Sequence, residues 1–337
     1  MVALLCEYDA LPGLGHACGH NLIAMGSVAA GVAVKEVLRQ ASLCGKVLIL
    51  GTPGEEGGAG KVHLLKAGAF DGVSAAMMAH PSTRNAAASA TTAVAKYGVT
   101  YTGRPAHAAG APWDGVNAVD AAVAAYVNVA MLRQQLRPDW RVSGIFRESG
   151  EQPNIIPAQA TIEFDLRAPD VIQLDQLRRK VLACFEAGGI SSGCEVRVDQ
   201  PMLTYENLEP NLTMAGTYRA YAEQYGLQFS GALVSTPSAA STDVGNVSHV
   251  VPTIQPYYTL DAATDGGNHT EGFRDASNHP ASYDVTFRVA KALALTAVRV
   301  LTDTQFLQDI KSEFEKSRAL SSLHNNGSDA VEPLAKL

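Results

Sequence analysis

Apolar positions follow two different spacings in the first part of the chain. Short apolar runs at Val2–Leu5 and Val47–Leu50 end in Gly, Pro or acidic residues, which is typical of buried parallel strands that lead into loops. Asn21–Gln40 and Ala59–Ala67 carry apolar residues at helical spacing, and Val73–Met78 is another apolar run. The alternation of strands and helices predicts an α/β domain.

The pattern changes over residues 91–204. Thr91–Thr102 and Ala158–Arg167 alternate as half-buried strands do, and Cys194–Val198 predicts a third strand. Val116–Leu136 and Val171–Ala187 have the spacing of long helices. Two helices on one face of an antiparallel sheet would explain this order, so we expect an inserted α+β domain here.

The α/β pattern resumes near Asn211 with a helix to Tyr225, a strand within Val251–Tyr258 and a helix over Ser282–Leu301. We therefore expect one domain with a mixed, mainly parallel sheet flanked by helices, formed by residues 1–90 and 205–303. The polar residues 304–337 predict an irregular C-terminal tail.

Composition narrows the class of protein. A chain of 337 residues with 47% hydrophobic and 18% charged residues is long enough for two globular domains. The net charge is −7 without a basic block, which argues against nucleic-acid binding. The chain has no run of about 20 apolar residues, so we expect no membrane span. Five scattered cysteines favour a reducing compartment, so we expect a cytoplasmic protein.

Two loops that follow predicted strands carry side chains suited to metal binding and proton transfer. Loop Gly15–Asn21 places Cys18 and His20 two residues apart, and thiolate and imidazole are both good zinc ligands. A later loop carries Glu55 and Glu56, of which one can bind a metal while the other takes a proton from water. Cys18 as a small buried residue, and the glutamates as favourable charges at a helix start, are the alternatives.

His80 and His269 also follow apolar stretches, the second on a glycine-rich loop. A lone histidine in such a place is more often structural. Open α/β sheets bind ligands beyond the carboxyl ends of their strands, however, so four such loops together predict one shared site.

Three motifs of the chain resemble the zinc metallopeptidase and amidohydrolase family of aminoacylase, acetylornithine deacetylase and glutamate carboxypeptidase: Glu7–Pro12, Gly15–Asn21 and Gly51–Glu56. They are most similar to the subgroup of aminobenzoyl-glutamate hydrolase and the Xaa-Arg (β-alanyl-lysine) dipeptidases. The resemblance implies two divalent metal ions, zinc or else manganese or cobalt. It makes Cys18 the bridging ligand and adds four others, His20, Glu56, His80 and His269. Glu55 would be the general base and acid, and Asp9 would orient a ligand.

The resemblance extends to the inserted domain, which it makes a lid and dimerisation domain of a homodimer. His107, in Arg-Pro-Ala-His-Ala, would polarise the scissile carbonyl, often from the partner subunit. Asn154 and Arg167 match lid positions that contact a substrate carboxylate, for which the planar guanidinium of Arg is suited. From the residues alone, Arg167 is a solvated charge at a strand end.

The resemblance implies hydrolysis of an amide bond next to a carboxylate, in a dipeptide or an N-acyl amino acid. A non-catalytic ligand-binding relative and an amide-forming enzyme with the same residues are alternatives that the sequence leaves open, as it does the choice of substrate. Two departures stand out: Asn21 replaces the Asp of many relatives, and the chain starts inside a predicted strand. Relatives carry a further N-terminal segment, so we expect the catalytic domain here to be shortened.

Overall fold

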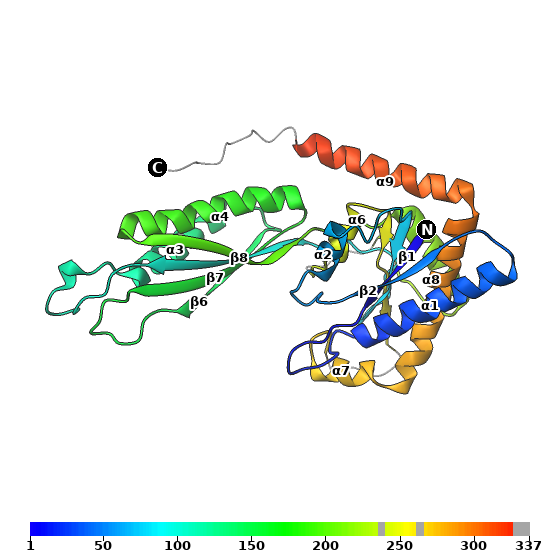
Figure 1. The fold of residues 1–337 in the computed structure, drawn as a ribbon, viewed down its shortest axis with the longest axis horizontal. Helices are drawn as coiled ribbons and strands as arrows, with labels where there is room; N and C mark the ends of the chain where they lie inside the picture. Colours follow the sequence, from blue (N-terminus) through cyan, green and yellow to red (C-terminus); the bar gives the residue numbers. More distant parts are fainter. Residues whose placement is uncertain (235–239, 261–265, 326–337) are drawn as a thin grey trace. The chain divides into compact units, whose positions relative to one another are not determined.

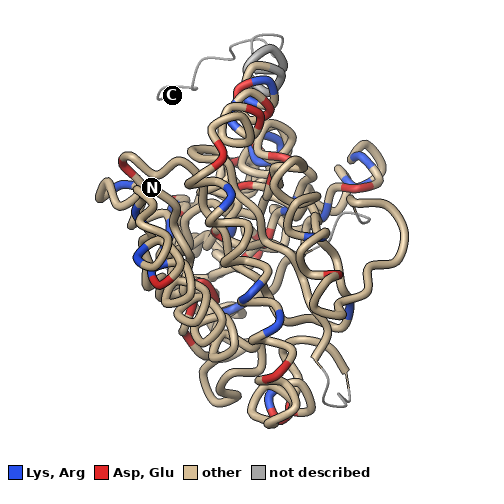
Figure 2. The backbone as a smooth tube through the Cα atoms, turned by 90° about the vertical axis from the view of Figure 1, so that its right-hand side faces the viewer, with Lys and Arg blue, Asp and Glu red and all other residues tan. Residues whose placement is uncertain are grey.

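The structure is a computed structural model that describes residues 1–234, 240–260 and 266–325. The chain forms two compact units, one of Met1–Thr91 with Leu208–Leu337 and one of Thr92–Asn207 (Figure 1). Lys and Arg lie interspersed with Asp and Glu along the backbone (Figure 2).

A four-stranded parallel sheet is the centre of the first unit. Its order is β2-β1-β3-β9, with bounds β1 Val2–Glu7, β2 Val47–Thr52, β3 Ala75–Met77 and β9 Thr253–Ile254. All six residues of β1 are buried, because both faces of the sheet are covered. Val2 and Leu4 belong to one apolar core, and Ala3 and Leu5 belong to another. This explains why β1 is a continuous apolar run.

Helices cover both faces of this sheet. The first core includes residues from α1 (His20–Gln40), α5 (Leu212–Gln224), α7 (Glu271–Ser277) and α8 (Pro280–Thr302). The second core is lined by residues next to α2 (Gly60–Lys66) and by α6 (Val244–Ser248). By length and composition α1 meets the requirement for a membrane span, a test that core helices also pass. Here α1 packs against β1 and α8.

The prediction of a single strand near Val251–Tyr258 is wrong in the number of strands. Two short strands in different sheets lie there. β9 ends at Ile254, and β10 (Tyr257–Thr259) pairs in parallel with β4 (His80–Ser82). Pro256 lies between β9 and β10 and has no N–H for a ladder, while its carbonyl accepts a hydrogen bond from the His80 amide at 2.8 Å.

The prediction of an irregular tail after residue 303 is wrong over Thr304–Asn325, which form helix α9. Phe306 and Ile310 are buried in the first core. The Glu313 carboxylate accepts hydrogen bonds from the amides of Leu212 and Thr213, at the start of α5. A few apolar residues among many polar ones were enough to fix this helix, since only one narrow face packs.

The second unit is an antiparallel sheet with two helices on one face (Figure 1). The sheet order is β6-β7-β5-β8, with bounds β5 Ala93–Thr102, β6 Arg141–Glu148, β7 Gln159–Ala168 and β8 Glu195–Tyr205. The helices are α3 (Ala118–Leu132) and α4 (Val171–Ser192), and short 3-10 turns lie at Pro112–Asp114 and Arg133–Gln135. β6 was not predicted, because this edge strand is largely exposed and lacks the alternation of a half-buried one. The expected fold class, α/β with an inserted α+β domain, is confirmed.

Candidate metal centre

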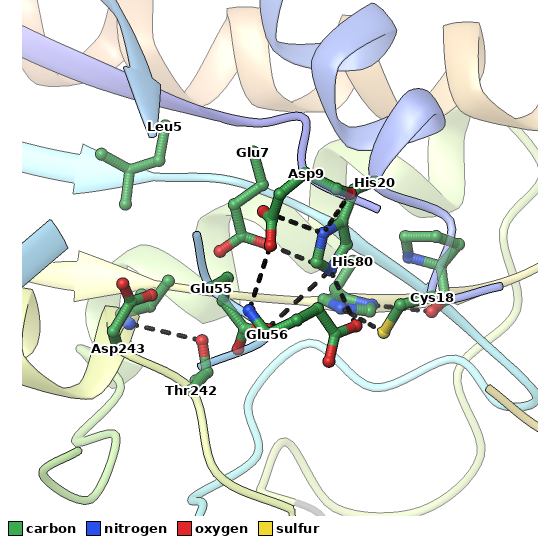
Figure 3. A network of polar contacts seen from close by, with 12 residues as sticks. Leu5, Glu7, Asp9, Cys18, His20, Glu55, Glu56, His80, Thr242 and Asp243 are labelled. Carbon is green, nitrogen blue, oxygen red and sulfur yellow. Dashed lines mark hydrogen bonds and ion pairs between the residues drawn. The ribbon is translucent and has the colours of Figure 1, made fainter. Parts of the chain in front are cut away.

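The polar loops named from the sequence meet beyond the carboxyl ends of the parallel strands (Figure 3). Loop 8–19 follows β1 and ends where α1 begins at His20, and loop 53–59 follows β2. Gly19 adopts φ +76°, and a Cβ there would lie 2.4 Å from the Pro81 Cγ atom. Glycine therefore lets the chain turn between Cys18 and His20 while it passes close to the segment of His80.

Cys18, His20 and His80 offer one ligand atom each within 4.8 Å of one another, and all three residues are buried. The Cys18 Sγ atom lies 3.7 Å from the His80 Nε2 atom. His80 Nδ1 donates a hydrogen bond to the Pro81 carbonyl at 2.8 Å, and His20 Nδ1 donates to the Asp9 carbonyl at 3.1 Å. In both rings these bonds leave the Nε2 lone pair directed into the cluster.

Glu56 and His269 complete a second group of three with Cys18. His269 Nε2 lies 3.2 Å from Glu56 Oε1. His269 adopts φ +71°, an unusual value for a residue other than glycine, and its amide donates to the Ala17 carbonyl at 2.8 Å. Such a held conformation is common where a side chain must point in a required direction. Asp9 supports both groups, since its Oδ2 accepts from the Glu56 amide at 3.0 Å.

The unsatisfied atoms of this cluster fit bound cations. Among the described residues, His20 Nε2 and Glu56 Oε1 are buried with no hydrogen-bond partner, which is costly without a ligand. Two donors on one ion, at roughly 2.0–2.3 Å bonds and near-tetrahedral angles, lie about 3–3.7 Å apart. The Cys18–His80 and His269–Glu56 separations given above fall in this range. Because Cys18 belongs to both groups, the arrangement fits two ions that share its sulfur.

Burial has the largest effect on the pKa values of Cys18, His20 and His80, and nearby charged groups add to it or oppose it. Burial and the charges of Glu56 and Glu55 raise the pKa of the Cys18 thiol far above its usual range. Burial lowers the pKa of His80 to about 4. Burial would also lower the pKa of His20, but its hydrogen bond to Asp9 and the charge of Glu7 raise that pKa to about 9. Bound cations reverse the situation of the thiol, because metal binding favours the thiolate.

Glu55 lies beside the ligand groups and is only 8% exposed. Its Oε2 atom is 4.0 Å from His20 Nε2. Burial and then the negative charge of Glu7 raise the pKa of the Glu55 carboxyl well above its usual value. A carboxyl with a raised pKa holds a proton more readily than a free one, which suits a group that takes and returns a proton.

Three buried charged residues next to the cluster were not predicted: Glu7, Lys61 and Asp243, each 0% exposed. The Lys61 ammonium contacts Glu7 and lies 2.6 Å from Asp243 Oδ1. Glu7 stands in one of the recognised motifs, whereas Asp243 carries no local signal. For Lys61 the one hint is its place within a short, partly apolar helix.

The predicted residues of the second unit lie in two separate places. Ala108 donates its amide to the Asn154 carbonyl at 3.0 Å, and His107 bridges to Ile155, so His107 and Asn154 are neighbours, both exposed. Arg167 lies on β7 opposite Val94 and forms an ion pair with Asp165 at 3.3 Å. The structure therefore does not bring Arg167 together with the other two within this unit.

Comparisons with known proteins bear on this arrangement. The sequence model of the family described as a peptidase dimerisation domain matches residues 89–191. The Xaa-Arg dipeptidase of Mus musculus is 45% identical over 318 residues, covering 93% of this chain and 73% of the relative. One of the subunits of the p-aminobenzoyl-glutamate hydrolase of Escherichia coli is 28% identical, covering 94% and 80%. A dinuclear metal-binding peptidase of the M20 family from Bacillus subtilis superposes with a TM-score of 0.63 at 19% identity, covering 89% of this chain and 81% of that structure.

The fold and the ligand cluster define a metal-dependent hydrolase of amide or peptide bonds. The chain belongs to the M20 family of peptidases, which includes the Xaa-Arg dipeptidases and the aminobenzoyl-glutamate hydrolases. The family resemblance stated from the motifs is thereby confirmed. The comparisons give no support to a non-catalytic or an amide-forming role.

Proposed function

We propose that the chain hydrolyses dipeptides with a basic C-terminal residue, using two zinc ions held by Cys18, His20, Glu56, His80 and His269. The observation that carries this proposal is the pair of ligand groups that share Cys18. A thiolate with imidazoles favours zinc over magnesium or calcium, and manganese or cobalt would be substitutes. Five free cysteines support a reducing compartment, the cytoplasm.

Each residue has a separate task in the proposed reaction. Zinc held by these residues would polarise a carbonyl and make water more acidic. Glu55 takes the proton of the attacking water and delivers it to the leaving amine, a role that its buried position beside His20 supports. His107 donates a hydrogen bond to the developing oxyanion, and Asn154 and Arg167 hold the substrate carboxylate.

Metal content is expected to depend on the buried histidine. His80→Ala should weaken binding of at least one ion by more than about 100-fold, because it removes a donor rather than a supporting contact. Elemental analysis after dialysis against a chelator series would measure this. His63→Ala, an exposed histidine on α2, is the matched control and should bind metal as the natural chain does. Equal metal content in both variants would remove His80 from the ligand set.

The choice of substrate rests on the relatives. The two Xaa-Arg dipeptidases are 45% and 42% identical to this chain, against 28% for the aminobenzoyl-glutamate hydrolase chain compared above. A panel of dipeptides, N-acetyl amino acids and aminobenzoyl-glutamate should give the highest kcat/KM for dipeptides ending in Arg or Lys. Amidation of their C-terminus should cost about 10- to 100-fold, from the loss of charged hydrogen bonds. Faster cleavage of aminobenzoyl-glutamate would contradict the assignment.

The geometry of the second unit supports a homodimer. His107 and Asn154 lie beyond the Thr102 end of β5, whereas Arg167 pairs with Val94 at the other end. At roughly 3.3 Å per residue these ends are about 26 Å apart, too far for one dipeptide to reach from a single copy. We infer that His107 and Asn154 serve the site of the partner subunit. Exposed apolar residues at four-residue spacing on α3, namely Val123, Val127 and Met131, are suited to the contact.

A further inference from the structure

The group of Glu7, Lys61 and Asp243 is a fully buried charged network beside the proposed ligands. Lys61 extends from α2 and meets Glu7, the last residue of β1, and Asp243, the residue before α6 (Figure 3 shows the two carboxylates). The Lys61 amide also donates to Asp243 Oδ2 at 2.9 Å. Burying one ammonium and two carboxylates costs several kcal/mol per ion before pairing. Such a network calls for a function.

The Lys61 ammonium takes the place that a further cation would occupy. Oxygen atoms of Glu7, Glu55 and Asp243 lie within 4.8 Å of one another, a spacing that suits a metal ion. The ammonium contacts two of these three carboxylates directly. This corner is therefore filled by a cation of the chain itself, and it is not another metal site.

Lys61 leaves one oxygen of Glu7 unused. Lys61 contacts Oε1, while Oε2 is buried and has no hydrogen-bond partner among the described residues. Glu7 Oε2 lies 3.6 Å from His20 Nε2, which is equally without a partner. The His20 Nδ1 atom is engaged with Asp9, so Nε2 is the ring atom that faces the Glu7 carboxylate. Without a bound ion a proton on Nε2 relieves this contact, whereas in the loaded site a metal ion would take the place of that proton, and the separation suits two donors on one ion.

We propose that Glu7 is a sixth protein ligand of the metal centre, on the ion held by His20, and that Lys61 is the positioning residue that holds it there. This inference rests on the proposed function and goes beyond its five ligands. The ion at His269 already has the carboxylate of Glu56, so Glu7 would give the ion at His20 a carboxylate as well and a fourth protein donor. With four protein donors against three, the ion at His20 is expected to be bound more tightly.

Cobalt titration of metal-free protein tests this proposal. The affinity of each ion is measured by chelator competition, and visible absorption reports the ligands of bound cobalt. Glu7→Gln should lower the affinity for one of the two cobalt ions by about 100-fold or more, since it removes a charged donor. The absorption spectrum of cobalt bound at that position should change as well. Asp243→Asn is the matched control, because it removes a similar ion pair of Lys61 but no atom near His20. It should lower Tm, and it should weaken binding of the ion at His20 less than Glu7→Gln does, because every donor atom stays in place.

The outcomes separate this inference from the proposed function. Absence of cobalt binding by the natural chain would overturn the proposed function itself. Normal binding of both ions by Glu7→Gln with an unchanged spectrum, or equal weakening in Glu7→Gln and Asp243→Asn, would overturn only the role of Glu7. If Glu7→Gln does not fold, Glu7→Asp is the second variant. It keeps a negatively charged partner for Lys61 but moves the carboxylate back by one methylene. Its affinity for the same single ion should fall, and unchanged affinities in this variant would equally refute the role.

Discussion

Glu55→Gln is expected to lower kcat by about 100- to 10,000-fold, the range that general acid–base catalysis contributes. The amide cannot accept the proton of the attacking water or protonate the leaving amine. Metal content should stay at the natural level, because Glu55 stands beside the two ligand groups that share Cys18 and does not belong to either. The measurement is kcat on an arginine-terminated dipeptide together with elemental analysis of the same preparation.

Glu36→Gln is a suitable control for this experiment. Glu36 lies on α1 and forms an exposed ion pair with Arg39 at 2.6 Å, so its loss should leave kcat and metal content unchanged. If Glu55→Gln turned over at the natural rate while it was fully loaded with metal, another group would have to be the base. If it lost metal, Glu55 would be a ligand and the assignment of Glu56 would need revision.

Mixed dimers of two inactive variants are expected to regain activity. His107→Ala alone should cost about 100- to 1,000-fold, as loss of one oxyanion donor does. In a heterodimer of Glu55→Gln and His107→Ala, the site with intact Glu55 receives His107 from the other subunit. One of its two sites is then complete, so purified heterodimers should show about half of the natural activity.

Coexpression with two affinity tags yields such heterodimers, and each homodimer of a single variant is the control. A heterodimer as inactive as the homodimers would mean that His107 acts within its own subunit. A monomeric natural chain at assay concentration would contradict the homodimer itself. The separation of His107 from Arg167 along β5 and β7 is the structural basis of the expected rescue.

Much of the fold follows from local sequence. β1 and β2 are apolar runs that pair in a parallel sheet. The helices that follow them carry apolar residues at a spacing of three to four. Gly19 and the other loop glycines mark the turns after those strands. The loops that carry the candidate ligands could be located because each follows an apolar stretch. The assignment of the five ligands, with Glu56 as a ligand and Glu55 as the base, came from the family resemblance of the motifs. Local periodicity is sufficient to place strands, helices and loops, since it reports which face of each element is buried.

The tertiary structure alone decided the remaining features, because they depend on residues far apart in the chain. Lys61 and Asp243 are 182 residues apart, and only the order of the strands brings them to Glu7. The separation of β9 from β10 at Pro256 depends on which strands each of them meets. The helix over Thr304–Asn325 depends on the core surface against which Phe306 and Ile310 pack. Periodicity contains no information on such pairings, whereas burial of unpaired charge is so unfavourable that the folded chain must pair these groups.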